Sequence, residues 1–303
     1  HALALCRVDG MRFSAAVFTN LTRDHLDFHA DMESYFAAKR RLFEHLPQDA
    51  PAVVNIDDPR GASLIGFGAQ TLTYAISRPA DVMPGPLTFS VEGLVFEVTT
   101  PVGLVRVQSK LVGKVNVYNI LAAVGTAVAL GLPVSAIERG LASLQGVPGR
   151  FELVSEPRDG VSVIVDYAHT DDALRNLLET ARTLGGRRLI TVFGAGGDRD
   201  RAKRPLMGMV AARLSDVVVI TSDNPRSEEP MRIIEEVRLG ALPEKRRGVQ
   251  IETIAWAAPG DIVLIAGKGH EKYQEVAGRT FPFDDAAVAR EALEARRLKA
   301  RVG

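Results

Sequence analysis

Four polar segments in the second half of the chain hold the side chains best suited to chemistry. They span residues 166–169, 194–200, 223–226 and 267–271, and each closely follows a short apolar run. Together they are rich in Arg, Lys and Asp, with glycines between the charged residues. Such a set can bind carboxylates through its cations and amines through its carboxylates. It therefore predicts a ligand that carries both groups.

Each of these segments also has a simpler interpretation. The glycines at 194–197 resemble the start of a dinucleotide fingerprint, but Asp198 stands where the glycine that packs the helix is needed. The run 223–225 alone is typical of an ordinary turn. His169 suits a structural hydrogen bond, and Lys268 between two glycines suits either an anion contact or a mobile turn. None of the four segments indicates a ligand site by itself; only their combination does.

The first half of the chain holds weaker candidates. Residues 24–29 combine two aspartates and two histidines, a composition that suits magnesium or manganese but also a solvated loop. Lys39 stands beside Arg40 and Arg41, which is typical of a solvated cationic face. Asn116 is a good helix N-cap by type, whereas Asn119 has no such default explanation.

The elements that must position these residues follow from the apolar pattern. In the second half, strands are expected at 161–165, 189–193, 217–220 and 262–266, with helices at 170–184, 203–214, 231–239 and from about 285. Strands that alternate with helices predict a parallel, doubly wound sheet. Ligands of such sheets bind beyond the carboxyl ends of the strands, so the four segments are expected on one rim.

The first half predicts a mixed α/β unit. Strands are expected at 15–19 and 51–56, and Asp31 is expected to cap the helix between them. The pattern over 72–107 predicts antiparallel hairpins. A helix follows over about 117–128, stopped by Gly131 and Pro133, and Ser135 with Glu138 forms a candidate capping box for one more helix. The turn-rich run at 146–149 divides the predicted domains, 1–149 and 150–303.

Bulk composition narrows the function classes. The chain of 303 residues has 37 basic and 37 acidic residues, so no overall basic field attracts it to nucleic acid or to an anionic membrane. A single cysteine, Cys6, excludes an internal disulfide. No apolar run approaches the roughly 18 residues of a membrane span, and no signal peptide is evident. We expect a cytoplasmic protein and, because the sequence starts at His1, an N-terminally truncated one.

In these residues the chain resembles the Mur ligases, and within them the branch that adds diaminopimelate. The motifs that carry the resemblance are H-A-L at 1–3, F-T-N-L-T-R-D-H-L-D-F-H at 18–29, Y-F-A-A-K at 35–39, V-N-V-Y-N at 115–119, P-G-R-F-E at 148–152, V-D-Y-A-H-T at 165–170, F-G-A-G-G-D-R-D at 193–200, S-D-N-P-R at 222–226 and A-G-K-G-H-E at 266–271. The resemblance implies an α/β fold, with a partial mononucleotide-binding central domain and a Rossmann-like doubly wound C-terminal domain.

The resemblance also implies a reaction and its ligands. ATP phosphorylates the γ-carboxylate of UDP-MurNAc-L-Ala-D-Glu, and an amine of meso-diaminopimelate attacks the acyl phosphate, with magnesium (Mg2+) bound. The implied catalytic and metal-supporting residues are His25 and Lys39, the lysine as a carbamate. The implied ATP contacts are Asn116, Asn119, Arg150 and Asp166. The implied substrate contacts are Arg7 for the nucleotide sugar and, for the amino acid, Arg199, Asp223, Asn224, Pro225, Arg226, Gly267 and Glu271. A monomer is expected.

The chain also departs from the family pattern. It contains no G-x-x-x-x-G-K-[ST] loop to hold ATP phosphates, so we expect no ligase activity from these residues alone. Leu5 stands where relatives can carry a polar substrate contact, and the stretch 240–259 is short for the family. Two other hypotheses stay open: a sister ligase (L-lysine-adding, D-Ala-D-Ala-adding or folylpolyglutamate synthetase), and a non-catalytic binding protein. The D-N-P-R motif favours diaminopimelate.

Overall fold

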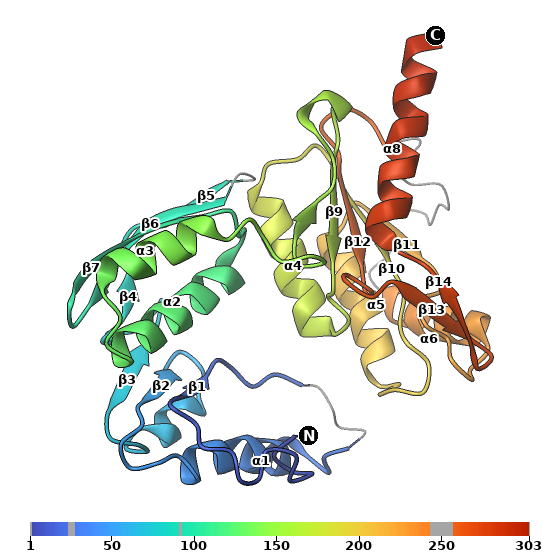
Figure 1. Ribbon diagram of the computed structural model, residues 1–303. Helices are drawn as coiled ribbons and strands as arrows, with labels where there is room; N and C mark the ends of the chain where they lie inside the picture. Colours follow the sequence, from blue (N-terminus) through green and yellow to red (C-terminus); the bar gives the residue numbers. More distant parts are fainter. Residues whose placement is uncertain (1, 24–27, 91–92, 243–256, 303) are drawn as a thin grey trace. The chain divides into compact units, whose positions relative to one another are not determined.

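Two compact units make up the chain, and each has its own hydrophobic core. The structure is a computed structural model that describes residues 2–23, 28–90, 93–242 and 257–302 (Figure 1). The first unit runs to Gln145 and the second begins at Gly146. The division falls at the turn-rich run noted in the sequence.

The first unit begins with a small parallel sheet. It contains β1 (Ala16–Phe18), β2 (Ala52–Asn55) and β3 (Thr71–Tyr74) in that spatial order, with helix α1 (Met32–Glu44) and the 3-10 helix η1 (Gly61–Leu64) in the connections. Asp31 caps α1 as expected: its Oδ1 accepts from the Ser34 N–H at 2.7 Å. Phe18 and Phe36 pack edge to face at 6.1 Å, which fixes α1 on this sheet.

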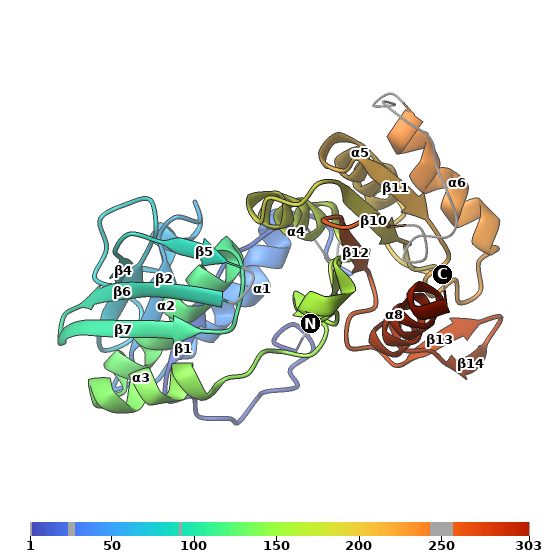
Figure 2. The same cartoon turned by 90° about the horizontal axis from the view of Figure 1, so that it is seen from above.

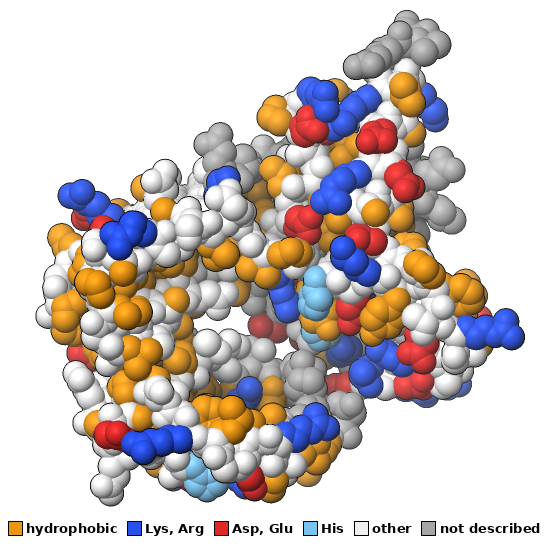
Figure 3. All heavy atoms as spheres, in the orientation of Figure 1, with side chains coloured by type: hydrophobic (Ala, Val, Ile, Leu, Met, Phe, Trp, Pro, Cys, Tyr) orange, Lys and Arg blue, Asp and Glu red, His pale blue; other side chains and the backbone are white. Residues whose placement is uncertain are grey.

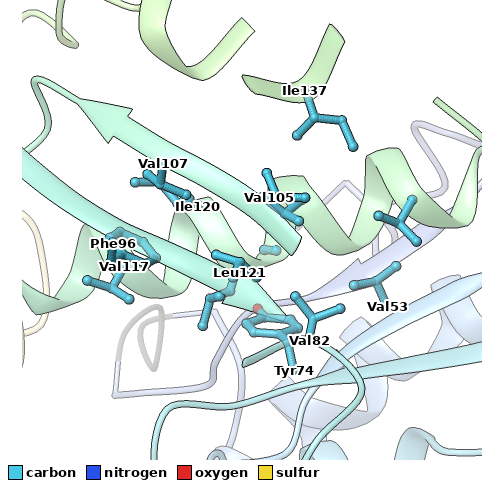
Figure 4. Close-up of a cluster of buried hydrophobic side chains, with 14 of the residues drawn as sticks. Val53, Tyr74, Val82, Phe96, Val105, Val107, Val117, Ile120, Leu121 and Ile137 are labelled. Atoms are coloured by element: carbon cyan, nitrogen blue, oxygen red, sulfur yellow. The ribbon is translucent and has the colours of Figure 1, made fainter. Parts of the chain in front are cut away.

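An antiparallel sheet with two helices completes the first unit. The elements are β4 (Met83–Pro84), β5 (Thr88–Ser90), β6 (Gly93–Thr100), β7 (Gly103–Ser109), α2 (Lys114–Ala129) and α3 (Val134–Ser143). β6 alternates buried and exposed residues, so Leu94, Phe96 and Val98 face inward. They meet the apolar face of α2, including Ile120 and Leu121, in one buried cluster (Figure 4).

Three local expectations for this unit were wrong. The strand at Leu72 is parallel to β2, since its partner is Val53 and the chain between them crosses over through η1. Asn116 does not cap α2: the helix starts earlier, with Gly113 at the cap position (φ 92°), and the Asn116 side chain donates back to the Val112 carbonyl.

The predicted capping box of α3 is also absent. Pro133, with φ at −69°, occupies the cap position and starts the helix two residues earlier than expected. This places Ser135 inside the helix. The Glu138 carboxylate instead accepts from the Arg106 N–H on β7 at 2.9 Å. Tertiary pairing therefore replaces the local cap.

The second unit is a doubly wound sheet, as predicted. Its strand order is β11-β10-β12-β9-β8, with β9 (Ser162–Asp166), β10 (Leu189–Phe193), β11 (Val217–Ile220) and β12 (Ile262–Ala266) parallel and β8 (Glu152–Leu153) antiparallel to β9. A 3-10 turn, η2 (Pro157–Asp159), follows β8. The hairpin β13 (Tyr273–Val276) and β14 (Arg279–Pro282) forms a separate antiparallel pair.

Helices cover both faces of this sheet. Leu189 and Leu264 pack with α4 (Asp171–Thr183), α5 (Lys203–Leu214) and α6 (Pro230–Ala241). Their strand neighbours Ile190 and Val263 point the other way, toward Leu293 of α8 (Asp285–Val302). Figure 2 shows α4 and α5 on one side of the strands and α8 on the other. Thr170 caps α4 as expected, accepting from the Ala173 N–H.

The surface carries charges of both signs. Figure 3 shows basic and acidic side chains intermixed over the visible face of the C-terminal unit. This agrees with the equal totals of basic and acidic residues in the sequence. Within the described part of the chain, every helix is too short or too polar to cross a membrane.

Candidate functional site at the carboxyl edge of the second sheet

The parallel strands of the second unit end together, which places the four polar segments on one rim. Pairing sets Phe193 beside Ala266, and Ala266 beside Asp166. Ile220 pairs with Phe193 on the other side. Residues 166–169, 194–200, 223–226 and 267–271 therefore leave the sheet from the same edge. The geometry that the alternating pattern predicted is present.

Asp166 organises one end of this rim. Its Oδ2 accepts from the Phe151 N–H at 2.7 Å and its Oδ1 from the Ala168 N–H at 2.8 Å, while its carbonyl accepts from the Gly267 N–H. Burial raises the pKa of Asp166 above its usual range. The Arg150 guanidinium carbon lies 4.5 Å from the centre of the adjacent Tyr167 ring. Asp166 thus holds the loops that present Arg150 and Tyr167.

Glu271 is an anion held by neutral donors. Tyr167 donates its hydroxyl to Glu271 Oε1 at 3.3 Å, and Asn224 donates Nδ2 to Glu271 Oε2 at 3.0 Å. Asn224 is 3% exposed, and its Oδ1 accepts from the Glu275 N–H at 2.8 Å, which fixes the orientation of the amide. Among the described residues, no Lys or Arg lies within ion-pair distance of Glu271. Its charge is therefore available to a cationic group of a ligand.

Arg226 joins two loops of the rim. Its backbone has a positive φ of 52° and pairs with the hairpin, donating to the Glu275 carbonyl and accepting from the Ala277 N–H. Its Nη1 donates to the Gly197 carbonyl at 2.6 Å, and its Nε lies 3.9 Å from Glu275 Oε2. The guanidinium has five N–H donors, so this contact leaves others for a ligand carboxylate.

The glycine at 197 is explained by close packing of the same two loops. The Gly197 N–H donates to the Asn224 carbonyl at 2.8 Å. A Cβ at this position would lie 1.9 Å from the Pro225 carbonyl oxygen. Any side chain would therefore force the loops apart. Neighbouring Arg199 is exposed, and its Nη1 donates only weakly to the Asp198 carbonyl at 3.3 Å.

Sequence reasoning missed the buried arginine that supports these loops. Arg204 of α5 is 0% exposed and pairs with Glu228 at 2.8 Å and Glu236 at 2.6 Å. Its Nη2 also donates to the Gly196 carbonyl, and Glu228 accepts from the Asp198 N–H. Hydrogen bonds from Arg204 come first among the causes that lower the pKa of Glu228 to about 2. The basic residues at 201, 203 and 204 were the available signal, and their type alone does not distinguish a buried cation from a solvated one.

Two of the four predicted ATP contacts, Asn116 and Asn119, lie together on α2 in the first unit, whereas Arg150 and Asp166 lie in the second. Asn119 donates Nδ2 to Asn116 Oδ1 at 3.1 Å, and Asn119 is exposed. Beside them, Tyr118 donates its hydroxyl to Asp57 Oδ2 at 2.8 Å. Burial first, and then the Asp57 hydrogen bond, raises the pKa of Tyr118 to about 12. Sequence reasoning missed this pair, because Asp57 and Tyr118 lie 61 positions apart in the chain.

The other predicted residues of the first unit are dispersed or undescribed. Lys39 is half-buried on α1, with its Nζ 5.0 Å from the centre of the Tyr35 ring, and Tyr35 stacks on His29 at 4.8 Å. Arg7 is exposed. His25 lies outside the described residues. Among the residues that are described, no group of three or more His, Cys, Asp or Glu side chains is arranged to hold a metal.

Comparison with known protein families agrees with this architecture. Residues 1–127 match the Mur ligase middle domain, and residues 149–269 match the glutamate ligase domain of Mur ligases. The two matches fall within the first and second structural units, respectively.

Curated relatives and solved structures give the same result. The chain is 51% identical over 306 residues to UDP-N-acetylmuramoyl-L-alanyl-D-glutamate--2,6-diaminopimelate ligase of Solibacter usitatus, covering 97% of this chain and 62% of the relative. The Gloeobacter violaceus protein of the same name is also 51% identical, with 99% and 63% covered. A solved structure of a ligase of this name is 38% identical, with a TM-score of 0.63 over 98% of this chain and 63% of that one.

A more distant structure supports the fold alone. The MurF ligase of Thermotoga maritima in complex with ADP is 21% identical, with a TM-score of 0.69 over 98% of this chain and 64% of that one. The chain spans about three fifths of the length of the curated relatives it matches. With a middle-domain match, a glutamate-ligase-domain match and relatives at half identity, the chain belongs to the Mur ligase family.

Proposed function

We propose that this chain carries the amino-acid-binding part and, without the phosphate-binding loop, some of the ATP contacts of a ligase that joins meso-diaminopimelate to UDP-N-acetylmuramoyl-L-alanyl-D-glutamate. In this reaction ATP transfers its γ-phosphoryl group to the D-glutamate γ-carboxylate. A neutral amine of the amino acid attacks the acyl phosphate, an amide bond forms, and phosphate leaves. The proposal rests on the names of the relatives and on one observation: Glu271, which has no cationic partner among the described residues, shares a rim with Arg226.

The chemistry of that rim fits a diamino dicarboxylic acid. The amine that attacks belongs to one end of diaminopimelate, and the opposite end carries an ammonium and a carboxylate. Glu271 can accept from the ammonium, because its present donors are neutral. Arg226 can hold the carboxylate with two parallel bonds. L-Lysine lacks this carboxylate, so it would leave the guanidinium without its anion.

The first unit supplies the proposed nucleotide contacts. An exposed carboxamide such as that of Asn119 can both donate to and accept from the edge of an adenine. Lys39 would offer oxygen ligands to magnesium only after carbamylation, and His25, the other predicted ligand, lies outside the described residues. Bound there, magnesium would neutralise phosphate charge.

We also propose that the protein acts as a monomer in the cytoplasm, with small-molecule partners and no nucleic acid. The balanced charge supports the absence of a nucleic-acid partner, since it gives no overall basic field. Light scattering after size-exclusion chromatography checks the monomer.

Binding measurements on residues 1–303 test the amino-acid site. Isothermal titration calorimetry should show that meso-diaminopimelate binds more tightly than L-lysine. Arg226→Lys keeps a positive charge but loses the planar fork. We expect it to weaken diaminopimelate binding about ten- to a hundredfold, the range for a charged hydrogen bond, and to leave lysine binding nearly unchanged.

Arg279→Lys on β14 is the matched control, because it makes the same change on an exposed residue of the hairpin. If Arg226→Lys keeps the full preference for diaminopimelate, the far carboxylate is read by another group. If neither amino acid binds the wild-type chain, the assignment of the rim is wrong. Steady-state assays of a full-length ligase containing these residues provide the corresponding Michaelis constants.

A further inference from the structure

A buried lysine at the amino-acid rim pairs with one carboxylate and interacts electrostatically with a second. Lys268 has a side chain only 5% exposed, and its Nζ lies 3.4 Å from Asp223 Oδ1. Asp285, the first residue of α8, is 8% exposed and interacts electrostatically with both. Within the described chain, Asp223 is the one carboxylate within ion-pair distance of Lys268. The cluster thus holds two carboxyl groups and one ammonium.

This composition leaves one negative charge without a buried cation. The centres of the Tyr273 and Phe283 rings lie 5.9 and 5.8 Å from Lys268 Nζ, and both rings attract the ammonium through cation–π contacts. Burial first, and then repulsion by Asp223, raises the pKa of Asp285 to about 6. Burial also raises the pKa of Asp223, and Lys268 opposes that change. One proton on Asp285 therefore balances the cluster.

The remaining charged groups near the cluster are at its margins. Asp284 on α8 repels Asp285, but Asp284 is itself paired with Lys272, whose side chain is 78% exposed. Glu271 and Arg226 act on Asp223 in opposite directions. Among the described residues that influence both carboxylates, Lys268 is therefore the buried cation that they share.

The backbone directs Asp223 toward the rim. Its carbonyl accepts from Gln274 Nε2 at 2.5 Å, which ties it to the hairpin. A Cβ on Gly267 would lie 3.5 Å from Asp223 Oδ2, the oxygen that does not face Lys268, so the glycine keeps this oxygen uncovered. The Asp223 side chain is 12% exposed. One oxygen is thus held by the lysine and the other is left toward a ligand.

We infer that Lys268 is a positioning residue that holds the Asp223 carboxylate for an ammonium group of the amino acid, and that Asp285 competes with Asp223 for Lys268. This inference rests on the proposed amino-acid site. When Asp285 is protonated, Lys268 neutralises Asp223 alone. When Asp285 ionises, the ammonium is shared and Asp223 carries more charge toward the ligand. Amino-acid binding therefore tightens as the pH rises through about 6.

Calorimetry of residues 1–303 with meso-diaminopimelate between pH 5 and pH 7 tests this. Over this range the carboxyl groups of the ligand stay ionised and its amines stay protonated. We expect the wild-type affinity to rise about tenfold, as for a charge-assisted hydrogen bond that strengthens. Asp285→Asn should bind with little pH dependence. Lys268→Met should bind weakly throughout, because without the ammonium burial favours the protonated form of Asp223, which cannot pair with the ligand. Lys268→Arg should recover part of the affinity, and the exposed control Lys299→Met on α8 should behave as wild type.

Two further results overturn the inference. His169 and His270 also lie at the rim, against Tyr167. A pH dependence that persists in Asp285→Asn would belong to them. Equal affinity of Lys268→Met and wild type would likewise show that Lys268 positions nothing.

A ligand-free measurement separates this inference from the proposed function. Carbon-13 NMR of labelled aspartate carboxyls follows Asp223 directly. Asp285→Asn should lower the apparent pKa of Asp223, because repulsion is removed and Lys268 is no longer shared. If wild type binds no diaminopimelate, the proposed function fails; an Asp223 titration unmoved by Asp285→Asn overturns the inference itself.

Discussion

Replacing Arg204 by Met should destabilise the second unit more than any exposed arginine replacement of the same kind. Arg204 is fully buried, and its guanidinium contacts Glu228, Glu236 and the Gly196 carbonyl. Methionine fills similar space but leaves the mostly buried Glu228 with the half-exposed Arg201 as its remaining cationic partner. Removing one partner of a buried pair typically costs about 3–5 kcal/mol.

The pKa of Glu228 gives an independent magnitude. It falls from 4.5 to about 2 in the folded protein. At about 1.36 kcal/mol for each pKa unit this is roughly 3 kcal/mol for all the groups that stabilise the Glu228 carboxylate. Arg204 supplies the largest part, and the Asp198 N–H and Arg201 supply the rest. Because the folded-state pKa is depressed, this stability is fully present above pH 4.5 and is lost as the pH falls toward 2. The difference between wild type and variant should narrow over the same range.

Urea unfolding followed by circular dichroism, at pH 7 and at pH 3, measures both effects. Arg238→Met is the matched control. Arg238 also pairs with a glutamate, Glu235, on the neighbouring helix α6, but the two side chains are 45% and 49% exposed. A solvated pair of this kind adds little. If Arg204→Met costs no more than Arg238→Met, or if its cost does not shrink at pH 3, burial of the Arg204 pair does not stabilise the loops.

Three further predictions concern other parts of the chain. Gly197→Ala should lose amino-acid binding and roughly 1–3 kcal/mol of stability, since its Cβ would collide with a carbonyl of the facing loop; Gly140→Ala in α3, with open space around it, should unfold no earlier than wild type. Lys39→Ala in a full-length ligase should lose most turnover, with no rescue by bicarbonate and partial rescue by a short-chain carboxylic acid. Undiminished turnover would show that Lys39 is an ordinary solvated cation with no role in the reaction. Tyr118→Phe should cost about 1 kcal/mol through the lost bond to Asp57, and an unchanged urea midpoint would contradict that bond.

Features that depend on neighbouring residues were predicted from the sequence. Asp31 and Thr170 cap their helices because a cap needs only the next turn of backbone. The rim at the carboxyl edge was predicted for a similar reason, since strands alternating with helices run parallel and so end together. The prediction that Asn116 caps α2 was wrong, because the helix already starts after Gly113, three residues earlier.

The sequence alone thus determined the order of elements, the doubly wound sheet and the segments at its edge. Only the tertiary structure decided which charged residues act together. Arg204 and Arg238 are both helical arginines near glutamates, yet one is 0% and the other 45% exposed. Glu271 meets Asn224 across 47 positions in the sequence, and Lys268 meets Asp223 across 45. Burial and partners that are distant in the sequence determine the energy of a charged side chain, and neither can be derived from the residues next to it in the chain.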